Sequence, residues 1–146
     1  MRRLAETREK ITQATVLLNQ EKFDDADRLM SQVSVTQPMV EGAAVFRSLG
    51  EYYALQNQWQ EAASRFNVLL QIDQLDGWDV CTLDYLECGP ALVKQGDIES
   101  YERFRQGAVA RFVSGNYPFA DRIIKISLLL PASDKLLKDL RPMADM

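Results

Sequence analysis

Residues 45–66, VFRSLGEYYALQNQWQEAASRF, indicate the fold of this chain most directly. The stretch reads as two helical segments joined by a short polar break, yet Gly50 lies in the middle of the first segment. In the exposed interior of a helix, a glycine costs about 1 kcal/mol relative to alanine. We therefore expect Gly50 to lie where two paired helices approach closely, so that the packing gained around Trp59 and Phe66 offsets this cost.

Small residues recur at the spacing seen in this stretch. Gly50 is followed twelve residues later by Ala62, and the first small position recurs 36 residues before Gly50 and 39 residues after it. Tyr101 stands where a third pair would carry its second small residue, so we expect the helices of that pair to be splayed or shifted. The other small residues that recur at this spacing are Ala14, Ala26 and Gly89.

The order of residues in the middle pair resembles the tetratricopeptide repeat (TPR). Phe46-x2-Leu49-Gly50-x2-Tyr53, followed by Ala62-x3-Phe66, is close to the pattern of that family. The resemblance implies an all-α fold, a right-handed superhelix of antiparallel helix pairs with eight helices in a single domain over residues 1–146. The expected units are three repeats, at about 7–40, 43–76 and 82–115, and a terminal helix pair at 118–144, with turns supplied by Pro38 and Gly77.

The last part of the chain carries its own start and stop signals for helices. Gly115 is suited to end the preceding helix, and Pro118 suits the first turn of a helix over 118–130 that Pro131 ends. Ser133 is placed to cap a final helix, DKLLKDLRPMA.

Pro90 conflicts with the helix expected over 79–95 because proline removes a backbone donor and clashes with the preceding turn. We favour a kink near residues 86–90 over the alternative, a helix that begins only at Pro90, because the segment before it is too apolar for a loop.

A second resemblance covers about the last 65 residues. Residues 82–105 and 122–131 are similar to the TPR-like C-terminal tails of planctomycete-type bacterial serine/threonine protein kinases and WD40-repeat proteins. This resemblance is compatible with a role as the C-terminal module of a larger bacterial signalling protein, such as a serine/threonine kinase. The sequence holds no glycine-rich phosphate loop, HRD motif or DFG motif, so nothing catalytic is implied.

Composition excludes several classes of function. The chain contains no histidine, which removes Ser-His-Asp and Cys-His catalysis, HExxH metal sites and Cys/His zinc sites. The net charge is −4 and there is no run of Lys or Arg, so nucleic acid is not an expected partner. No stretch approaches the ~20 apolar residues of a membrane span, and the first residues lack the apolar stretch of a secretion signal. We expect a cytoplasmic protein, or an extracytoplasmic one if it is the tail of a membrane-tethered parent chain.

Acidic residues and cysteines offer no specific chemical site. Three aspartates near residue 76 follow the spacing 1, 4, 7, whereas an EF-hand needs ligands at 1, 3 and 5. We expect Asp79 to cap a helix beside a turn at Asp76 and Gly77. A second cluster, Asp24, Asp25 and Asp27, is expected to form a solvated helix start. Cys81 and Cys88 would lie about 10 Å apart on one helix, too far for a disulfide.

The family resemblance implies binding on a concave face formed by the first helix of each repeat. We therefore expect a non-catalytic scaffold, without a cofactor, that binds a peptide or helix of a partner protein. The alternative is a self-association module, so the chain would be a monomer or a homodimer. The candidate binding residues are Arg8, Ile11, Thr15, Asn19, Arg47, Glu51, Leu55 and Lys94.

The corresponding positions of the third repeat are mostly apolar. Two interpretations remain open: the terminal helices cover these residues, or the residues form a groove for an apolar helix or for a second copy of the chain. The positions are Leu83, Leu86, Pro90 and Val93, in addition to Lys94.

Overall fold

The computed structural model describes residues 2–33, 40–73, 78–113 and 119–145. Throughout these ranges the regular secondary structure is helical, with eight α-helices and no strand, as expected for an all-α chain. Contacts within the chain divide it into two compact units, Met1–Asp76 and Gly77–Met146. None of the described helices combines the length and the apolar composition that crossing a membrane requires.

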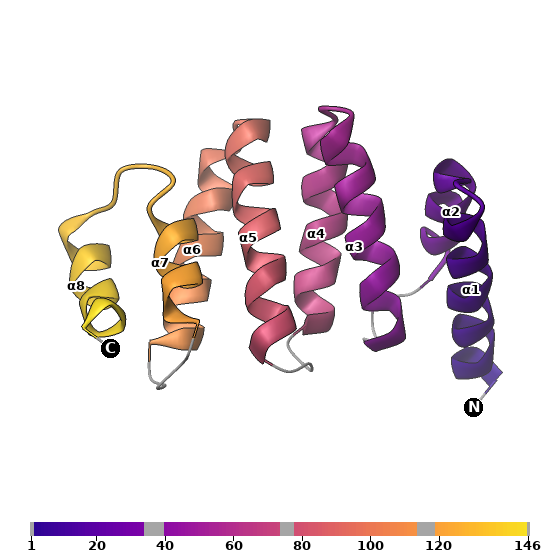
Figure 1. Ribbon diagram of the computed structural model, residues 1–146, viewed down its shortest axis with the longest axis horizontal. Helices are drawn as coiled ribbons and strands as arrows, with labels where there is room; N and C mark the ends of the chain where they lie inside the picture. The colour runs from indigo at the N-terminus through magenta and orange to yellow at the C-terminus, as the bar shows by residue number, and fades with distance from the viewer. Residues whose placement is uncertain (1, 34–39, 74–77, 114–118, 146) are drawn as a thin grey trace. The chain divides into compact units, whose positions relative to one another are not determined.

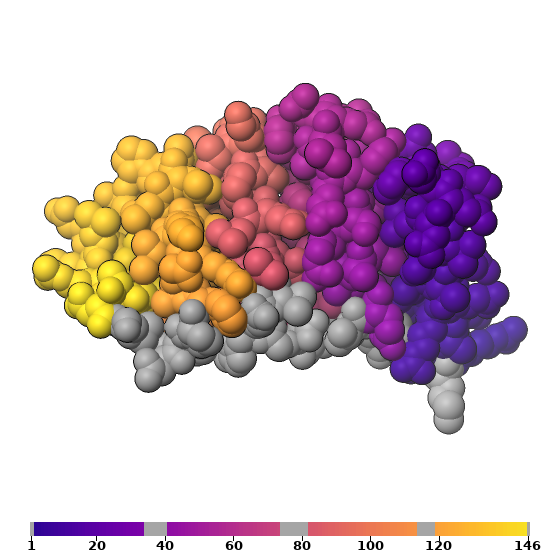
Figure 2. Space-filling view, viewed as in Figure 1, coloured from indigo at the N-terminus to yellow at the C-terminus, as the bar shows by residue number. Residues whose placement is uncertain are grey.

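The first unit contains two helical hairpins. In each hairpin the two helices contact one another, and the contact between α3 and α4 is the most extensive among the described helices. The helix α3 also contacts both helices of the first hairpin. Figure 1 shows α3 between α4 and that hairpin, and Figure 2 shows the atoms of the two hairpins in contact. The helices are α1 (Arg2–Asn19), α2 (Phe23–Met30), α3 (Val40–Leu55) and α4 (Trp59–Asp73).

The small residues of the first unit are buried, as predicted. A Cβ atom placed on Gly50 would lie only 2.4 Å from Cε1 of Phe66, a distance that real Cβ atoms do not show. The close neighbour of Gly50 is therefore the ring of Phe66 on α4. Ala62 is fully buried in the same hairpin, and Ala14 and Ala26 are fully buried in the first. Gly50 is thus required by packing, which explains why a glycine is kept inside a helix.

The turns of three hairpins share one backbone geometry. Glu21 and Asn57 have φ of 58°, and Gly96 in the second unit has φ of 83°, so all three adopt the left-handed conformation. Each lies two residues before the second helix of its hairpin. These positions are separated by 36 and 39 residues (57 − 21 and 96 − 57), the same spacings as the small positions. The three hairpins therefore repeat in register.

Glu21→Gly should raise the free energy of unfolding by about 0.5–1 kcal/mol because the left-handed conformation is strained for glutamate and not for glycine. Urea unfolding followed by circular dichroism measures the change. Gln20→Gly is the matched control because Gln20 is an exposed neighbour that does not have a positive φ. The control should be neutral or destabilising, and equal effects of the two changes would contradict the turn geometry.

The second unit contains four helices. The helix α7 contacts both α5 and α6, and α8 contacts α7 and, less extensively, α6. Side chains cap two of the helices: Asp97 accepts a hydrogen bond from the Ser100 backbone N–H at 2.9 Å, and Ser133 accepts one from Leu136 at 3.2 Å. The expected cap at Ser133 is confirmed. The helices are α5 (Trp78–Gln95), α6 (Ile98–Phe112), α7 (Ala120–Ser127) and α8 (Asp134–Ala144).

The helix α5 runs through Pro90 without a break. The alternative of a helix beginning at Pro90 is therefore wrong, and the apolar segment before it is helical. Asp79, which was expected to cap this helix, is the second residue of α5, and its side chain lies outside the described residues.

The third hairpin departs from the first two because Tyr101 replaces a small residue. Tyr101 is fully buried on α6, and its hydroxyl donates a hydrogen bond to the Ile126 carbonyl of α7 at 2.7 Å. A Cβ on Gly89 would lie 3.2 Å from Phe104 of α6 and 3.4 Å from Leu129, which follows α7. The contact between α5 and α6 is less extensive than that between α3 and α4, as expected for a shifted pair.

The helix α7 is shorter than predicted. It covers eight residues and ends at Ser127, although a helix over 118–130 was expected. The segment that follows is held by hydrogen bonds from α6, which explains why the helix does not continue to Pro131. The predicted turn and terminator positions at Pro38, Asp76, Gly77, Gly115 and Pro118 lie outside the described residues.

Candidate functional site

The first candidate surface is formed by α1 and α3, the first helices of the two hairpins in the first unit. These helices contact each other directly, and an ion pair joins Arg8 Nε to Glu41 Oε1 at 4.0 Å. Both side chains of this pair are more than half exposed, so the pair contributes little to stability. The pair joins the N-terminal half of α1 to the second residue of α3.

Most of the predicted binding residues of this unit are exposed. Leu55, at the C-terminal end of α3, is 86% exposed. Arg47 is half-buried. The hydroxyl of Thr15 donates to the Ile11 carbonyl at 2.9 Å, so it can act toward a ligand only as an acceptor. The exposed members of the set are Arg8, Thr15, Asn19, Glu51 and Leu55, which we call the α1–α3 face.

The prediction that Ile11 belongs to the binding surface is wrong. Its side chain is only 5% exposed. Its Cδ1 atom would lie 3.6 Å from a Cβ placed on Gly42 of α3, and Cδ1 of Ile72 would lie 3.8 Å from the same point. Ile11 therefore fills the contact between the two hairpins and cannot reach a ligand.

Lys94 belongs to the second unit, where it is exposed on α5. On the same helix Leu83 and Pro90 are exposed, whereas Leu86 and Val93 are half-buried. The terminal helices therefore leave part of the apolar set on α5 uncovered.

A polar cluster that sequence reasoning missed joins three helices of the first unit. Asp27 of α2 accepts a hydrogen bond from the Tyr53 hydroxyl of α3 at 2.8 Å and one from Arg65 Nε of α4 at 2.9 Å. A second bond from Arg65 makes the ion pair bidentate. The guanidinium carbon also lies 4.9 Å from the centre of the Tyr53 ring, within the range of a cation–π contact. Asp27 was expected to be solvated with Asp24 and Asp25, but it is a half-buried acceptor between the two hairpins.

The ionisation of this cluster follows from its surroundings. Burial raises the pKa of Asp27, but the hydrogen bonds from Arg65 and Tyr53 outweigh this effect and hold the pKa below the usual 3.8. Burial and the bond to Asp27 raise the pKa of Tyr53 to about 12. The bond to Asp27 also raises the pKa of Arg65. Since none of the three groups titrates near neutral pH, the cluster is suited to fixing the hairpins and not to acid–base catalysis.

Asp27→Asn should lower the free energy of unfolding at neutral pH by about 2 kcal/mol because Arg65 loses its charged partner. Because the pKa of Asp27 is depressed in the fold, its contribution is complete above the ordinary pKa and disappears as the pH falls through the folded value. The difference between wild type and variant, from urea unfolding at several pH values, should therefore be constant above about pH 5 and shrink below about pH 4.

Asp25→Asn is the matched control for this change. Asp25 forms an ion pair with Arg28 that is more than half exposed on the same helix, so its loss should cost at most about 1 kcal/mol. A wild-type–Asp27→Asn difference that persists unchanged at pH 3 would contradict the role given to the carboxylate.

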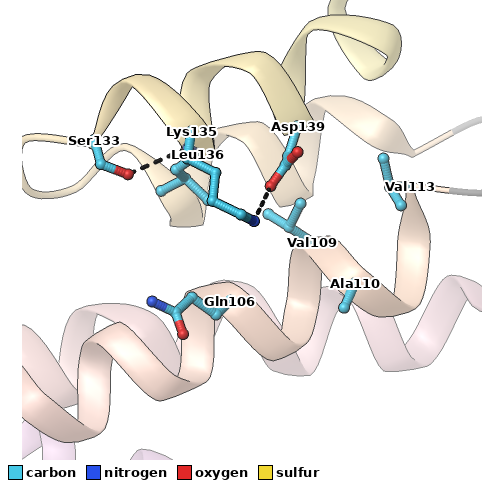
Figure 3. Close-up of a pocket in the computed structure, with 8 residues that line it drawn as sticks. All are labelled: Gln106, Val109, Ala110, Val113, Ser133, Lys135, Leu136 and Asp139. Carbon is cyan, nitrogen blue, oxygen red and sulfur yellow. Dashed lines mark hydrogen bonds and ion pairs between the residues drawn. The ribbon is translucent and has the colours of Figure 1, made fainter.

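The second candidate site is an open hollow of about 410 Å³ between α6 and α8 (Figure 3). The acid and the base in its lining form a salt bridge to each other, with Lys135 Nζ 2.9 Å from Asp139 Oδ2. The hydroxyl of Ser133 is used as the cap of α8. These three polar groups already have partners within the protein. The hollow is therefore better suited to accommodating an apolar side chain than to catalysis. The lining residues are Gln106, Val109, Ala110, Val113, Ser133, Lys135, Leu136 and Asp139.

The part of the chain that the structure describes offers neither a metal-binding cluster nor a reactive thiol. That part holds no group of three or more Cys, Asp or Glu side chains arranged to bind a metal ion. The thiol of Cys88 is buried, and its burial, with the nearby carboxylate of Asp84, raises its pKa to about 12. It is therefore protonated at neutral pH and packs as a small apolar group. The side chain of Cys81 lies outside the described residues.

Comparisons of this chain with protein-family models, with curated proteins and with solved structures find no match.

Proposed function

We propose that this chain is a non-catalytic protein-interaction module of TPR-like hairpins that binds a peptide or helix of a partner protein on the α1–α3 face. The observation that carries the proposal is the 86% exposure of Leu55 at the end of α3, one turn after the exposed Glu51. An exposed leucine beside a charged residue, on helices fixed by a packed core, is suited to anchoring an apolar side chain of a ligand.

The internal repeat supports this proposal. The hairpins share their turn geometry at intervals of 36 and 39 residues, and successive first helices α1 and α3 contact each other. Stacked hairpins of this kind expose a row of first helices along one side. A right-handed TPR-like superhelix is the arrangement we propose for them.

Selection of displayed random peptides against the intact chain tests the proposed function. We expect the selected peptides to bind wild-type protein and to lose at least tenfold in affinity with Leu55→Asp and with Glu51→Arg. Leu137→Asp is the matched control because Leu137 is an exposed leucine on α8, and its change should leave affinity unaltered. Peptides that bind all three variants equally would contradict the assignment of the α1–α3 face.

Self-association is the second candidate function, and exposed leucines favour it. Leu83, Leu128, Leu129 and Leu137 are each at least 41% exposed in the second unit. Light scattering across a concentration series separates the two functions, since the interaction module should remain a monomer. A dimer that forms in the micromolar range would favour self-association.

The setting of the module in the cell is part of the same proposal. The likeness of residues 82–105 and 122–131 to kinase and WD40-protein tails is our basis for placing it as the C-terminal module of a bacterial signalling protein. We propose a cytoplasmic location for it.

A further inference from the structure

Each unit begins with a hairpin, α1–α2 in the first and α5–α6 in the second. The two hairpins differ in how the next helix covers the end at which their two helices are joined by the turn. In the first unit the C-terminal half of α3 covers this end of the α1–α2 hairpin. The ring of Tyr52 stacks on Phe23, the first residue of α2, with centroids 4.3 Å apart. The hydroxyl of Tyr53 donates to Asp27, the fifth residue of α2, at 2.8 Å.

The equivalent end of the α5–α6 hairpin has no such cover from the helix that follows it. Ile98 and Glu102 are the first and fifth residues of α6 and so match Phe23 and Asp27 in register. The covering residues Tyr52 and Tyr53 are the 13th and 14th of α3, whereas α7 is only eight residues long. Figure 1 shows α5 and α6 continuing beyond the end of α7 toward their turn.

The exposure of the side chains agrees with this difference. Ile98 is 49% exposed, and the side chain of Glu102 is 38% exposed although it pairs with Arg105. Ile98 thus remains open to solvent, whereas its counterpart Phe23 in the other hairpin is stacked on an aromatic ring.

Two exposed leucines follow α7 on a segment that hydrogen bonds tie to Arg105 of α6, the partner of Glu102. Leu128 and Leu129 directly follow α7 and are 47% and 41% exposed. The backbone around them is fixed, because Arg105 donates hydrogen bonds to the carbonyls of Ser127 at 3.1 Å and Leu130 at 3.0 Å. A buried arginine thus holds a short apolar segment rigidly at the surface, which lowers the entropic cost of binding to it.

We infer that this surface, made of Ile98, Glu102, Leu128 and Leu129, binds a short amphipathic helix of a partner protein. The helix takes the place that the C-terminal half of α3 has in the first unit, with two adjacent aromatic residues toward α6. The ring of the first aromatic residue covers Ile98. The second aromatic residue is a tyrosine, whose hydroxyl donates a hydrogen bond to Glu102. The helix α3 is eight residues longer than α7 (16 − 8), so the partner helix needs about two turns, or about 12 Å, to match that difference.

The chain's own covering segment is the probe for this site. We would measure the binding of a labelled peptide of residues 47–57, with Gly50→Ala to favour the helix, to the intact protein by fluorescence anisotropy. The expected result is saturable binding that weakens at least tenfold when both tyrosines of the peptide are changed to alanine. Ile98→Asp in the protein should weaken binding at least tenfold as well, and an aspartate in the first turn of α6 is compatible with the helix dipole.

Leu137→Asp is the matched control in the protein, because Leu137 is 47% exposed on α8 of the same unit; this change should not alter binding. No binding of the peptide, or binding that Ile98→Asp leaves unchanged, would overturn the inference. Self-association that Ile98→Asp abolishes would assign the surface to a second copy and would also overturn it. Because this surface shares no residue with the α1–α3 face, these outcomes do not decide the proposed function, which Leu55→Asp tests.

Discussion

Gly50→Leu is expected to lower the free energy of unfolding by about 3 kcal/mol. The added side chain would have to enter the space of the Phe66 ring, which lies 2.4 Å from the position of a Cβ on Gly50. Phe66 is itself buried, so the ring has no room to move aside and the helices α3 and α4 must separate. Urea unfolding at equilibrium measures the loss.

The same substitution at Gly107 is the matched control. Gly107 lies inside α6, and a Cβ placed there would meet no atom within 4 Å. Gly107→Leu should therefore stabilise the chain by about 0.5–1 kcal/mol through helix propensity alone. Opposite signs at the two glycines are the expected pattern, and destabilisation at both positions would mean that general helix disruption, and not close packing, explains Gly50.

Arg105→Ala should lower the free energy of unfolding by about 3 kcal/mol. The Arg105 side chain is only 4% exposed and is neutralised by Glu102. It donates to the carbonyl of the last residue of α7 and to two carbonyls beyond the helix, of which Pro131 is the last, at 2.9 Å. Its loss would leave these carbonyls without their donor and release the segment that joins α7 to α8.

Arg103→Ala on the same helix is the control for the loss of an arginine. Arg103 pairs with Glu99, and both side chains are largely exposed, so the change should cost less than about 1 kcal/mol. Hydrogen exchange should also show faster exchange in α7 and α8 of Arg105→Ala than in α5. Equal stabilities of the two variants would contradict the role of Arg105 as the anchor of this segment.

Features encoded by local spacing could be predicted from the sequence. The burial of Gly50 could be inferred from two features of the sequence: a glycine is unfavourable inside a helix, and an alanine follows twelve residues later. Both features indicate the same close contact between α3 and α4. The cap at Ser133 and the irregular third hairpin at Tyr101 were likewise visible, since each depends on one residue in a known register.

Features made by contacts between distant residues could not be predicted in this way. Asp27 and Arg65 are 38 residues apart, and neither belongs to a periodic pattern, so their pairing is apparent only once the hairpins are packed. Arg105 binds carbonyls 22 to 26 residues away in the sequence, and these bonds hold the segment where α7 ends. The apolar pattern over 118–130 does not reveal them. Ile11 was misplaced because a position facing a ligand and a position facing the next hairpin differ by a small rotation of α1.

The central claim is that the hairpins depend on direct contact between a glycine backbone and a neighbouring helix, and a double-mutant cycle of Gly50→Ala and Phe66→Leu tests it most directly. Gly50→Ala alone should be destabilising, despite alanine's higher helix propensity. In the Phe66→Leu background the cost should fall, giving a coupling energy of at least about 1 kcal/mol. Additive effects within about 0.5 kcal/mol, or stabilisation by Gly50→Ala alone, would contradict the claim.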